Sequence, residues 1–143
     1  MIAIGSDHGG YELKEKIKDF FEGKLNFKDF GTDSLESVDY PEIAYKVADS
    51  IACGECQYGI LICRTGVGMS IVANKVKGIR CALCYNEKIG GLCKEHNNAN
   101  VISLPADMLS FEEIVNIINT WLETEFAGGR HEKRVNMIER NKG

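Results

Sequence analysis

Residues 59–68 read Gly-Ile-Leu-Ile-Cys-Arg-Thr-Gly-Val-Gly, and this stretch decides the fold. Its first half, Gly59 to Cys63, is a continuous apolar run of the kind that a parallel sheet buries on both faces. Its second half is a glycine-containing turn, after which a helix is expected from about Met69 to Lys75. A buried strand that passes through a short turn into a helix is the repeating unit of parallel α/β folds.

The same alternation continues on both sides of that unit. Apolar residues at helical spacing predict helices between short apolar runs, and a final basic helix is expected from Gly129-Arg130 to the C-terminus. Because such strands are joined by right-handed crossovers, the sequence predicts one domain over residues 1–143. Its fold class is α/β: a doubly wound, Rossmann-like five-stranded parallel sheet with helices on both faces and a C-terminal helix. The four further strands are expected at residues 1–4, 25–30, 79–84 and 100–104.

Composition narrows the possible partners. The chain has 143 residues, of which 44% are hydrophobic, enough for one core. Its 17 basic and 21 acidic residues give a net charge of −4, which argues against a nucleic-acid partner held by a general basic field. No apolar run approaches the ~20 residues of a membrane-spanning helix. Asp7 and His8 interrupt the first apolar stretch, which argues against a secretory signal, so we expect a cytoplasmic protein with no membrane partner.

The six cysteines allow three interpretations. A disulfide framework suits small exported proteins, and this chain has core enough without one. Cys53/Cys56 and Cys81/Cys84 have the spacing of a zinc site, but the second pair lies in a predicted strand. Residues three apart on a strand point to opposite faces, so the two thiols cannot hold one ion. We therefore expect reduced thiols, mostly in the core, and no metal.

Polar side chains lie next to the ends of the predicted strands. Asp7 and His8 follow the first strand, and Cys63 ends the third at the glycine turn. His96 and Asn97 directly precede the last strand. Ligands of such sheets bind beyond the carboxyl ends of the strands, so we expect these residues to share one rim.

The turn Thr65-Gly66-Val67-Gly68 could present several backbone N–H groups to an anion. It is not a dinucleotide fingerprint, because Ile71 stands where a third glycine is required, and no Gly-Lys-Ser/Thr follows to make a P-loop. The alternative is a tight strand-to-helix turn without a ligand. Anion binding is the favoured interpretation.

Cys63 could be one more buried thiol, the usual fate of cysteine. Its place beside the turn amides and Arg64 instead favours a reactive thiolate. A cysteine phosphatase would use the same geometry, but its signature needs an arginine where Met69 stands. The sequence therefore argues against phosphoryl transfer.

All three histidines lie in polar contexts, and no two have the spacing of metal ligands on a helix. His96 is the best candidate acid or base. His131, flanked by charge, is expected to be a solvated residue. Arg130 and Arg134 are four apart on one helix face, which suits a phosphate clamp as well as a plain wet surface.

Together these motifs resemble type B ribose-5-phosphate isomerase, in a wider family that includes galactose-6-phosphate isomerase subunits. The similarity covers nearly the whole chain, and the ordered set of motifs is highly specific. The motifs are Ser6-Asp7-His8-Gly9-Gly10, Asp29-Phe30-Gly31-Thr32, Asp39-Tyr40-Pro41, the Cys63-to-Ile71 turn with Ala73-Asn74-Lys75, His96-Asn97-x-x-Asn100-Val101, and Gly128-Gly129-Arg130-His131-x-x-Arg134-Val135.

The resemblance implies a cofactor-free, metal-independent isomerisation between ribose 5-phosphate and ribulose 5-phosphate, in pentose phosphate metabolism. It implies that Cys63 moves a proton between C1 and C2 through an enediolate, and that His96, with Asp7 nearby, opens the sugar ring. Preorganised amides can stabilise the developing oxyanion. The other roles it implies are the oxyanion contacts of Thr65, Gly66, Val67 and Gly68, the phosphate contacts of His8, Arg130 and Arg134, a sugar hydroxyl contact of Asn97, and substrate contacts of Tyr40 and Arg64.

Two positions depart from the family pattern. The family usually has glycine where Arg64 stands, and a phosphate-binding arginine where Asp107 stands. These changes suggest a different phosphorylated sugar, such as allose 6-phosphate or galactose 6-phosphate, or a paralogue that binds sugar phosphates without catalysis. The resemblance also implies a homodimer or homotetramer whose sites are completed by two subunits.

Overall fold

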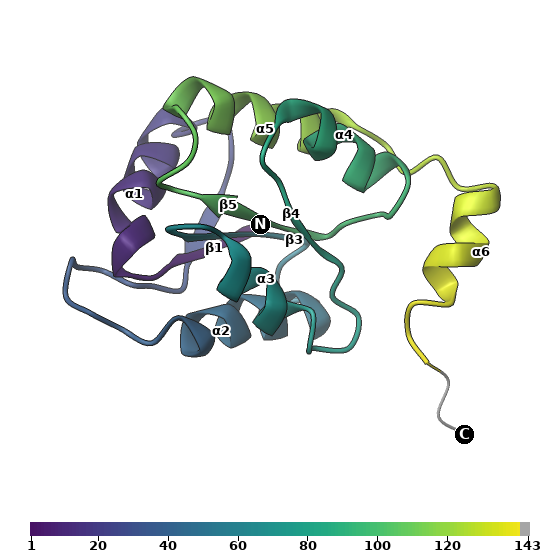
Figure 1. The fold of residues 1–143 in the computed structure, drawn as a ribbon, viewed down its shortest axis with the longest axis horizontal. Coiled ribbons are helices and arrows are strands. Elements are labelled where there is room, and N and C mark those ends of the chain that lie inside the picture. The colour runs from purple at the N-terminus through teal and green to yellow at the C-terminus, as the bar shows by residue number, and fades with distance from the viewer. Residues whose placement is uncertain (141–143) are drawn as a thin grey trace.

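The computed structural model describes residues 1–140, and it is built around one five-stranded sheet (Figure 1). All the pairings in this sheet are parallel, which confirms the predicted fold class. The strands lie in the order β2-β1-β3-β5-β4. Their bounds are β1 Ile2–Ser6, β2 Phe27–Asp29, β3 Tyr58–Cys63, β4 Cys81–Leu83 and β5 Val101–Pro105.

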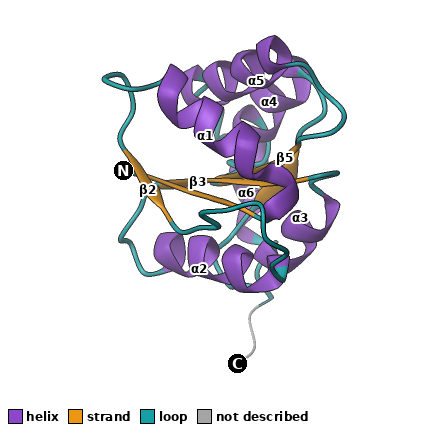
Figure 2. Cartoon of the chain, turned by 90° about the vertical axis from the view of Figure 1, so that its left-hand side faces the viewer, coloured by secondary structure: helices purple, strands orange, loops and turns teal. Residues whose placement is uncertain are grey.

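Helices cover both faces of the sheet (Figure 2). One face carries α1 (Tyr11–Phe20), α4 (Glu87–Glu95) and α5 (Phe111–Glu123). The other carries α2 (Tyr40–Ala52) and α3 (Val67–Ala73), and a short 3₁₀ helix, η1 (His8–Gly10), precedes α1. The last helix, α6 (Arg130–Asn136), stands apart from this sandwich, on the far right of Figure 1.

Local sequence signals explain where several helices begin. The Ser110 hydroxyl accepts from the N–H of Glu113, whose carboxylate in turn accepts from the Ser110 N–H, so α5 starts with a capping box. Asn86 caps α4 through the N–H of Ile89. Pro41 occupies the first turn of α2, where its missing N–H costs nothing.

The core has two halves because β3 is buried on both faces. Ile60 and Ile62 pack under α1 and α5, whereas Leu61 and Cys63 pack toward α2 and α3. This alternation is what the continuous apolar run predicts. The largest fully buried side chain, Trp121, donates its indole N–H to the carbonyl of Ala99.

Several element bounds differ from the sequence prediction, most of all those of β2, β4 and the last helix. β2 begins at Phe27 because the N–H of Leu25 donates to the carbonyl of Phe21 and so belongs to the turn that ends α1. β4 is likewise shorter than predicted. The last helix ends at Asn136, where the chain tightens into bonds between residues three apart; the rest of its predicted span includes residues 141–143, which lie outside the described residues.

Candidate active site

The carboxyl edge of the sheet brings Asp7 level with Cys63. Ser6 pairs with Ile62 in the register of β1 and β3, and the N–H of Asp7 donates to the Ile62 carbonyl at 3.2 Å. The Asp7 carboxylate caps η1 by accepting from the N–H of Gly10 at 3.0 Å. The sequence prediction that these two groups share one edge is confirmed.

Cys63 is buried, and its sulfur accepts a hydrogen bond from the N–H of Gly66 at 3.1 Å. Gly66 has a φ of 78°, a left-handed conformation that glycine adopts without strain. A Cβ at this position would lie 2.7 Å from Leu83 Cδ1. The turn therefore needs glycine both for its conformation and for space, and the result is an amide aimed at the sulfur.

Two hydroxyls hold this turn in place. Ser103 Oγ on β5 donates to the Gly66 carbonyl at 2.6 Å, and the Tyr85 hydroxyl donates to the Thr65 carbonyl at 2.7 Å. Neither residue was predicted from the sequence. The sequence did contain an indication for Ser103, because a hydroxyl within an apolar strand is buried and needs a hydrogen-bond partner there. Nothing in the sequence points to Tyr85.

The remaining turn residues are engaged with their neighbours. Thr65 Oγ1 accepts from the N–H of Val67 at 3.2 Å. The amides of Gly66 and Val67, predicted to hold an oxyanion, therefore donate within the turn in this structure. The Tyr40 ring from α2 lies so close to Gly68 that a Cβ there would be 2.6 Å from it.

His8 and Arg64 frame the same edge. The Nδ1 atom of His8 accepts from the N–H of Val38 at 3.3 Å, which fixes the orientation of the ring. Arg64 extends over Gly9 and pairs with Asp107, with 3.4 Å between the guanidinium and the carboxylate. Both side chains of this ion pair are well exposed, so the pair is weak and exchangeable.

His96 and Asn97 do not share this edge, and the prediction of a single rim is wrong. His96 ends α4, and the chain then enters β5 at Val101, which is level with Gly59 at the start of β3. Cys63 is four residues further along β3, or about 13 Å at the rise of a strand. A residue that precedes a parallel strand lies at the amino edge, so the candidate residues of each chain form two groups on opposite edges, which we call the carboxyl-edge and the amino-edge half-site.

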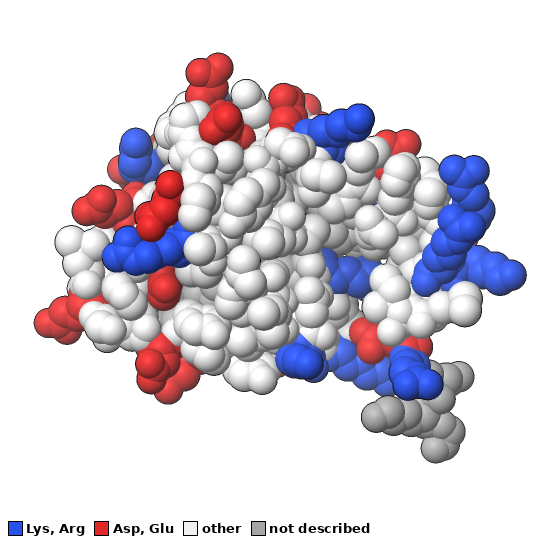
Figure 3. Space-filling view, viewed as in Figure 1, with Lys and Arg blue, Asp and Glu red and all other residues white. Residues whose placement is uncertain are grey.

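The amino-edge half-site is a cavity of about 340 Å³ between α4 and α6, lined by His96, Asn97, His131, Arg134, Val135 and Ile138. Both Arg130 and Arg134 are exposed, and Arg134 also lines this cavity. Lys and Arg side chains gather at the side of the molecule that α6 occupies (Figure 3).

His131 is not simply solvated, contrary to the sequence prediction. Its ring stacks on that of His96, with centroids 4.4 Å apart and planes inclined by 9°. Desolvation by this packing lowers the pKa of His131, and the neighbouring His96, Arg130 and Arg134 lower it further.

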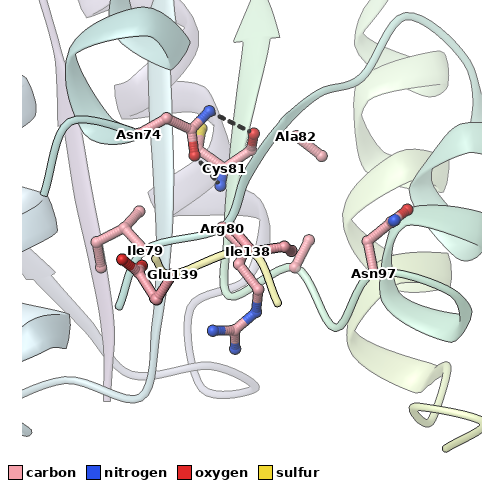
Figure 4. A pocket seen from close by; sticks show the side chains of 9 residues that line it. Asn74, Ile79, Arg80, Cys81, Ala82, Asn97, Ile138 and Glu139 are labelled. Atoms are coloured by element: carbon pink, nitrogen blue, oxygen red, sulfur yellow. Dashed lines mark hydrogen bonds between the residues drawn. The ribbon is translucent and has the colours of Figure 1, made fainter. Parts of the chain in front are cut away.

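A second cavity of about 400 Å³ adjoins the first and shares Asn97 and Ile138 with it (Figure 4). Arg80 projects into it and donates from Nε to the Asn98 carbonyl at 2.8 Å. Partial burial lowers the pKa of Arg80, although Glu139 opposes this effect. The sequence analysis did not single out Arg80.

The structure also shows how the side chains of the pair Cys81 and Cys84 are placed. Cys81 and Cys84 pack into opposite halves of the core, which confirms that they cannot share an ion. Burial raises the pKa of the Cys81 thiol. Among residues 1–140, the structure brings no three His, Cys, Asp or Glu side chains together as a metal site.

No helix within residues 1–140 is both long and apolar enough to cross a membrane.

A parallel α/β sheet with a hydrogen-bonded thiol at one edge and a cationic, histidine-lined cavity at the other defines an enzyme for small anionic substrates. Comparison with known proteins agrees: the sequence pattern described as Ribose/Galactose Isomerase matches residues 2–138. The chain belongs to this family of sugar-phosphate isomerases. It is accordingly an aldose–ketose isomerase, and the binding-only alternative is set aside.

Individual relatives match over almost their whole length. "Putative sugar phosphate isomerase YwlF" of Bacillus subtilis (strain 168) is 44% identical over 139 residues, which cover 96% of this chain and 93% of that protein. The structure of Clostridium thermocellum ribose-5-phosphate isomerase B is 49% identical, with a TM-score of 0.94 over 96% of this chain and 93% of that one. The Mycoplasma genitalium ribose-5-phosphate isomerase B structure, with bound ribulose-5-phosphate, is 40% identical, with a TM-score of 0.92 over 96% and 92%.

Proposed function

We propose that this enzyme interconverts ribose 5-phosphate and ribulose 5-phosphate, with Cys63 as the base. The observation that carries the proposal is the Gly66 N–H at 3.1 Å from the Cys63 sulfur. An amide donor at that distance stabilises a thiolate, the form of cysteine that accepts a proton. The bound ribulose-5-phosphate of the Mycoplasma genitalium homologue supports the choice of substrate.

In this scheme the Cys63 thiolate takes the proton from C2 of the open aldose and leaves an enediolate. The thiol then returns the proton to C1, while the hydroxyl proton moves from O2 to O1, so the sugar is rearranged without any net oxidation. Thr65 and the turn amides stabilise the oxyanion once substrate displaces their contacts within the turn. Asp7 and Tyr40 line the same edge and orient the sugar, and we assign His8, beside them, to the phosphate.

The amino-edge half-site supplies the remaining groups. We assign ring opening to His96, a sugar hydroxyl contact to Asn97, and the phosphate to Arg134 with Arg130. Because about 13 Å of sheet separates Cys63 from this edge within one chain, a complete site requires a second copy. We therefore propose a homodimer in which the carboxyl edge of one chain faces the amino edge of the other, with the same pairing repeated in any tetramer.

The Arg64–Asp107 ion pair supports a second substrate assignment. It places a cation and a carboxylate at the carboxyl edge of the sheet next to Cys63, where each can meet the far end of a substrate. We therefore keep allose 6-phosphate and galactose 6-phosphate as alternative substrates. For every one of these sugars we place the reaction in the cytoplasm, and for ribose 5-phosphate in pentose phosphate metabolism.

The central test is the Cys63→Ala variant, assayed for conversion of ribose 5-phosphate and for binding of ribulose 5-phosphate by calorimetry. Loss of the base should lower kcat by about 10²- to 10⁴-fold while the dissociation constant stays within a few-fold. Cys53→Ala, which removes an exposed thiol at the end of α2, is the matched control and should behave as wild type. A Cys63→Ala enzyme with wild-type kcat would mean that another group is the base.

A further inference from the structure

α6 is attached to the rest of the molecule by few contacts. None of its residues is buried, and it stands clear of the sandwich in Figure 1. The chain reaches it through Gly128 and Gly129, both with positive φ. Two hydrogen bonds flank the helix: the Ala127 N–H donates to the Glu95 carbonyl at 3.0 Å, and the Gly78 N–H donates to the Glu139 carboxylate at 2.8 Å.

Within α6 itself, the ring of His131 stacks on that of His96. The two rings are nearly parallel, with 4.4 Å between their centroids, which is a close stacked contact. Arg134 follows His131 by three residues, so both side chains lie on the same side of the helix. Both also line the cavity that holds His96 and Asn97.

We propose that His131 is a positioning residue, whose stacked ring fixes the plane of the His96 imidazole and the distance from that ring to Arg134. This inference rests on the proposed function, because it concerns the residues assigned there to the sugar ring and to the phosphate. A sugar phosphate has a fixed span from its ring oxygen to its phosphate. The stack holds His96 and Arg134 at a matching distance before substrate binds. Less conformational entropy is then lost when the site becomes ordered around the substrate.

The charges around His131 favour the neutral form of its imidazole ring, which is the form best suited to this stack. Arg130 and Arg134 on α6 bring positive charge close to the His131 ring, and His96 lies against it. Glu95, at the end of α4, has the opposite effect and raises the pKa of His131. Packing and these neighbours together lower the pKa of His131, which favours the neutral form of the ring. A neutral imidazole can lie flat on His96 without charge repulsion, and Arg134 then remains free for an anion.

The test compares His131→Phe with His131→Ala in the full-length enzyme. Phenylalanine keeps a flat ring for stacking and lacks the imidazole nitrogens, whereas alanine removes the stack. Asn136→Ala, an exposed and uncharged change on the same helix, is the matched control. We expect kcat/KM for ribose 5-phosphate to fall by about 10- to 100-fold in His131→Ala and to stay within about threefold of wild type in His131→Phe.

Two results would overturn the inference. Wild-type kinetics in His131→Ala would mean that the stack positions nothing, and equal damage in both variants would mean that the nitrogens of His131 matter rather than its ring. The proposed function is tested separately by the wild-type assay. If wild type proves inactive on ribose 5-phosphate, the NMR shifts of the His96 ring protons decide: they should move in His131→Ala and be retained in His131→Phe, and unchanged shifts in both would refute the stack.

Discussion

Gly66 is the residue on which the geometry of the thiol depends most directly. Its amide reaches Cys63 only because its backbone is left-handed, and its missing Cβ leaves room for Leu83. We expect Gly66→Ala to lower the free energy of unfolding by about 1–3 kcal/mol and also to lower kcat, because the turn must shift away from the sulfur. Urea denaturation and steady-state kinetics on the same variant would measure both effects.

Gly54→Ala is a suitable control for that experiment. Gly54 has a φ of 85°, and nothing lies within 4 Å of its missing Cβ. The control should therefore lose stability through backbone strain alone and keep its kcat. If Gly66→Ala kept full activity, the amide would have no part in the chemistry.

Arg64 and Asp107 should set the substrate preference. Removing the carboxylate in Asp107→Asn frees the guanidinium and removes a negative charge from the path of the phosphate. We expect this change to lower the KM for phosphorylated sugars, and Arg64→Gly to raise it by about tenfold, the effect of one charge-assisted hydrogen bond.

Steady-state kinetics on ribose 5-phosphate, allose 6-phosphate and galactose 6-phosphate would measure these preferences. The wild-type enzyme should not favour ribose 5-phosphate to the extent usual for type B ribose-5-phosphate isomerases. A ribose 5-phosphate efficiency normal for the family, together with unchanged values in both variants, would show that the pair is only surface charge.

At the scale of the elements, α6 should respond to pH. The pKa of His131 is held below its ordinary value near 6.5 when α6 is docked, so the undocked state binds the proton more tightly. Docking is therefore favoured above that value and weakens as the pH falls below it. Amide hydrogen exchange of residues 130–136, corrected for the intrinsic pH effect, should show lower protection at pH 5.5 than at pH 7.5.

His131→Phe provides the comparison, because its ring does not titrate. Its α6 should show the same corrected protection at both pH values. If the variant and the wild type changed equally, the pH response of α6 would not come from His131.

The elements themselves were largely predictable from the sequence. The apolar run that forms β3 and the periodic apolar residues of α5 show directly which faces of these elements are buried. The bounds of β2 and α6 were less predictable, because one or two backbone hydrogen bonds at each turn decide them.

The candidate site was predictable only in part. The turn at Cys63 follows from local sequence, and so does its place beside Asp7. The location of His96 follows from a topological rule, because a residue that precedes a parallel strand lies at the amino edge of the sheet. The prediction of a single rim did not apply this rule to His96 and Asn97. Tyr85, Arg80 and the stacking of His131 depend on contacts between distant segments, and no local pattern records those contacts.

At the scale of the whole molecule, the two half-sites make a prediction about mixed subunits. Cys63→Ala and His96→Ala should each be inactive alone, because every site then lacks one group. After subunit exchange, about a quarter of the sites should combine an intact Cys63 from one chain with an intact His96 from the other. The assay is the recovery of activity on mixing, followed over time.

Mixing either variant with itself is the control for that experiment. Failure to recover activity, with exchange of subunits verified by mass spectrometry, would show that one chain contains its complete site.

The width of the sheet has a consequence for how such an enzyme can evolve. In the proposed dimer one rigid layer holds the two reactive edges of each chain apart, so a substitution that merely loosens self-association should also abolish turnover while leaving every chain correctly folded. Natural selection on sugar metabolism would then act on the contact surface as strictly as on the thiol, and a duplicated gene could not change its pairing partner without risking its chemistry.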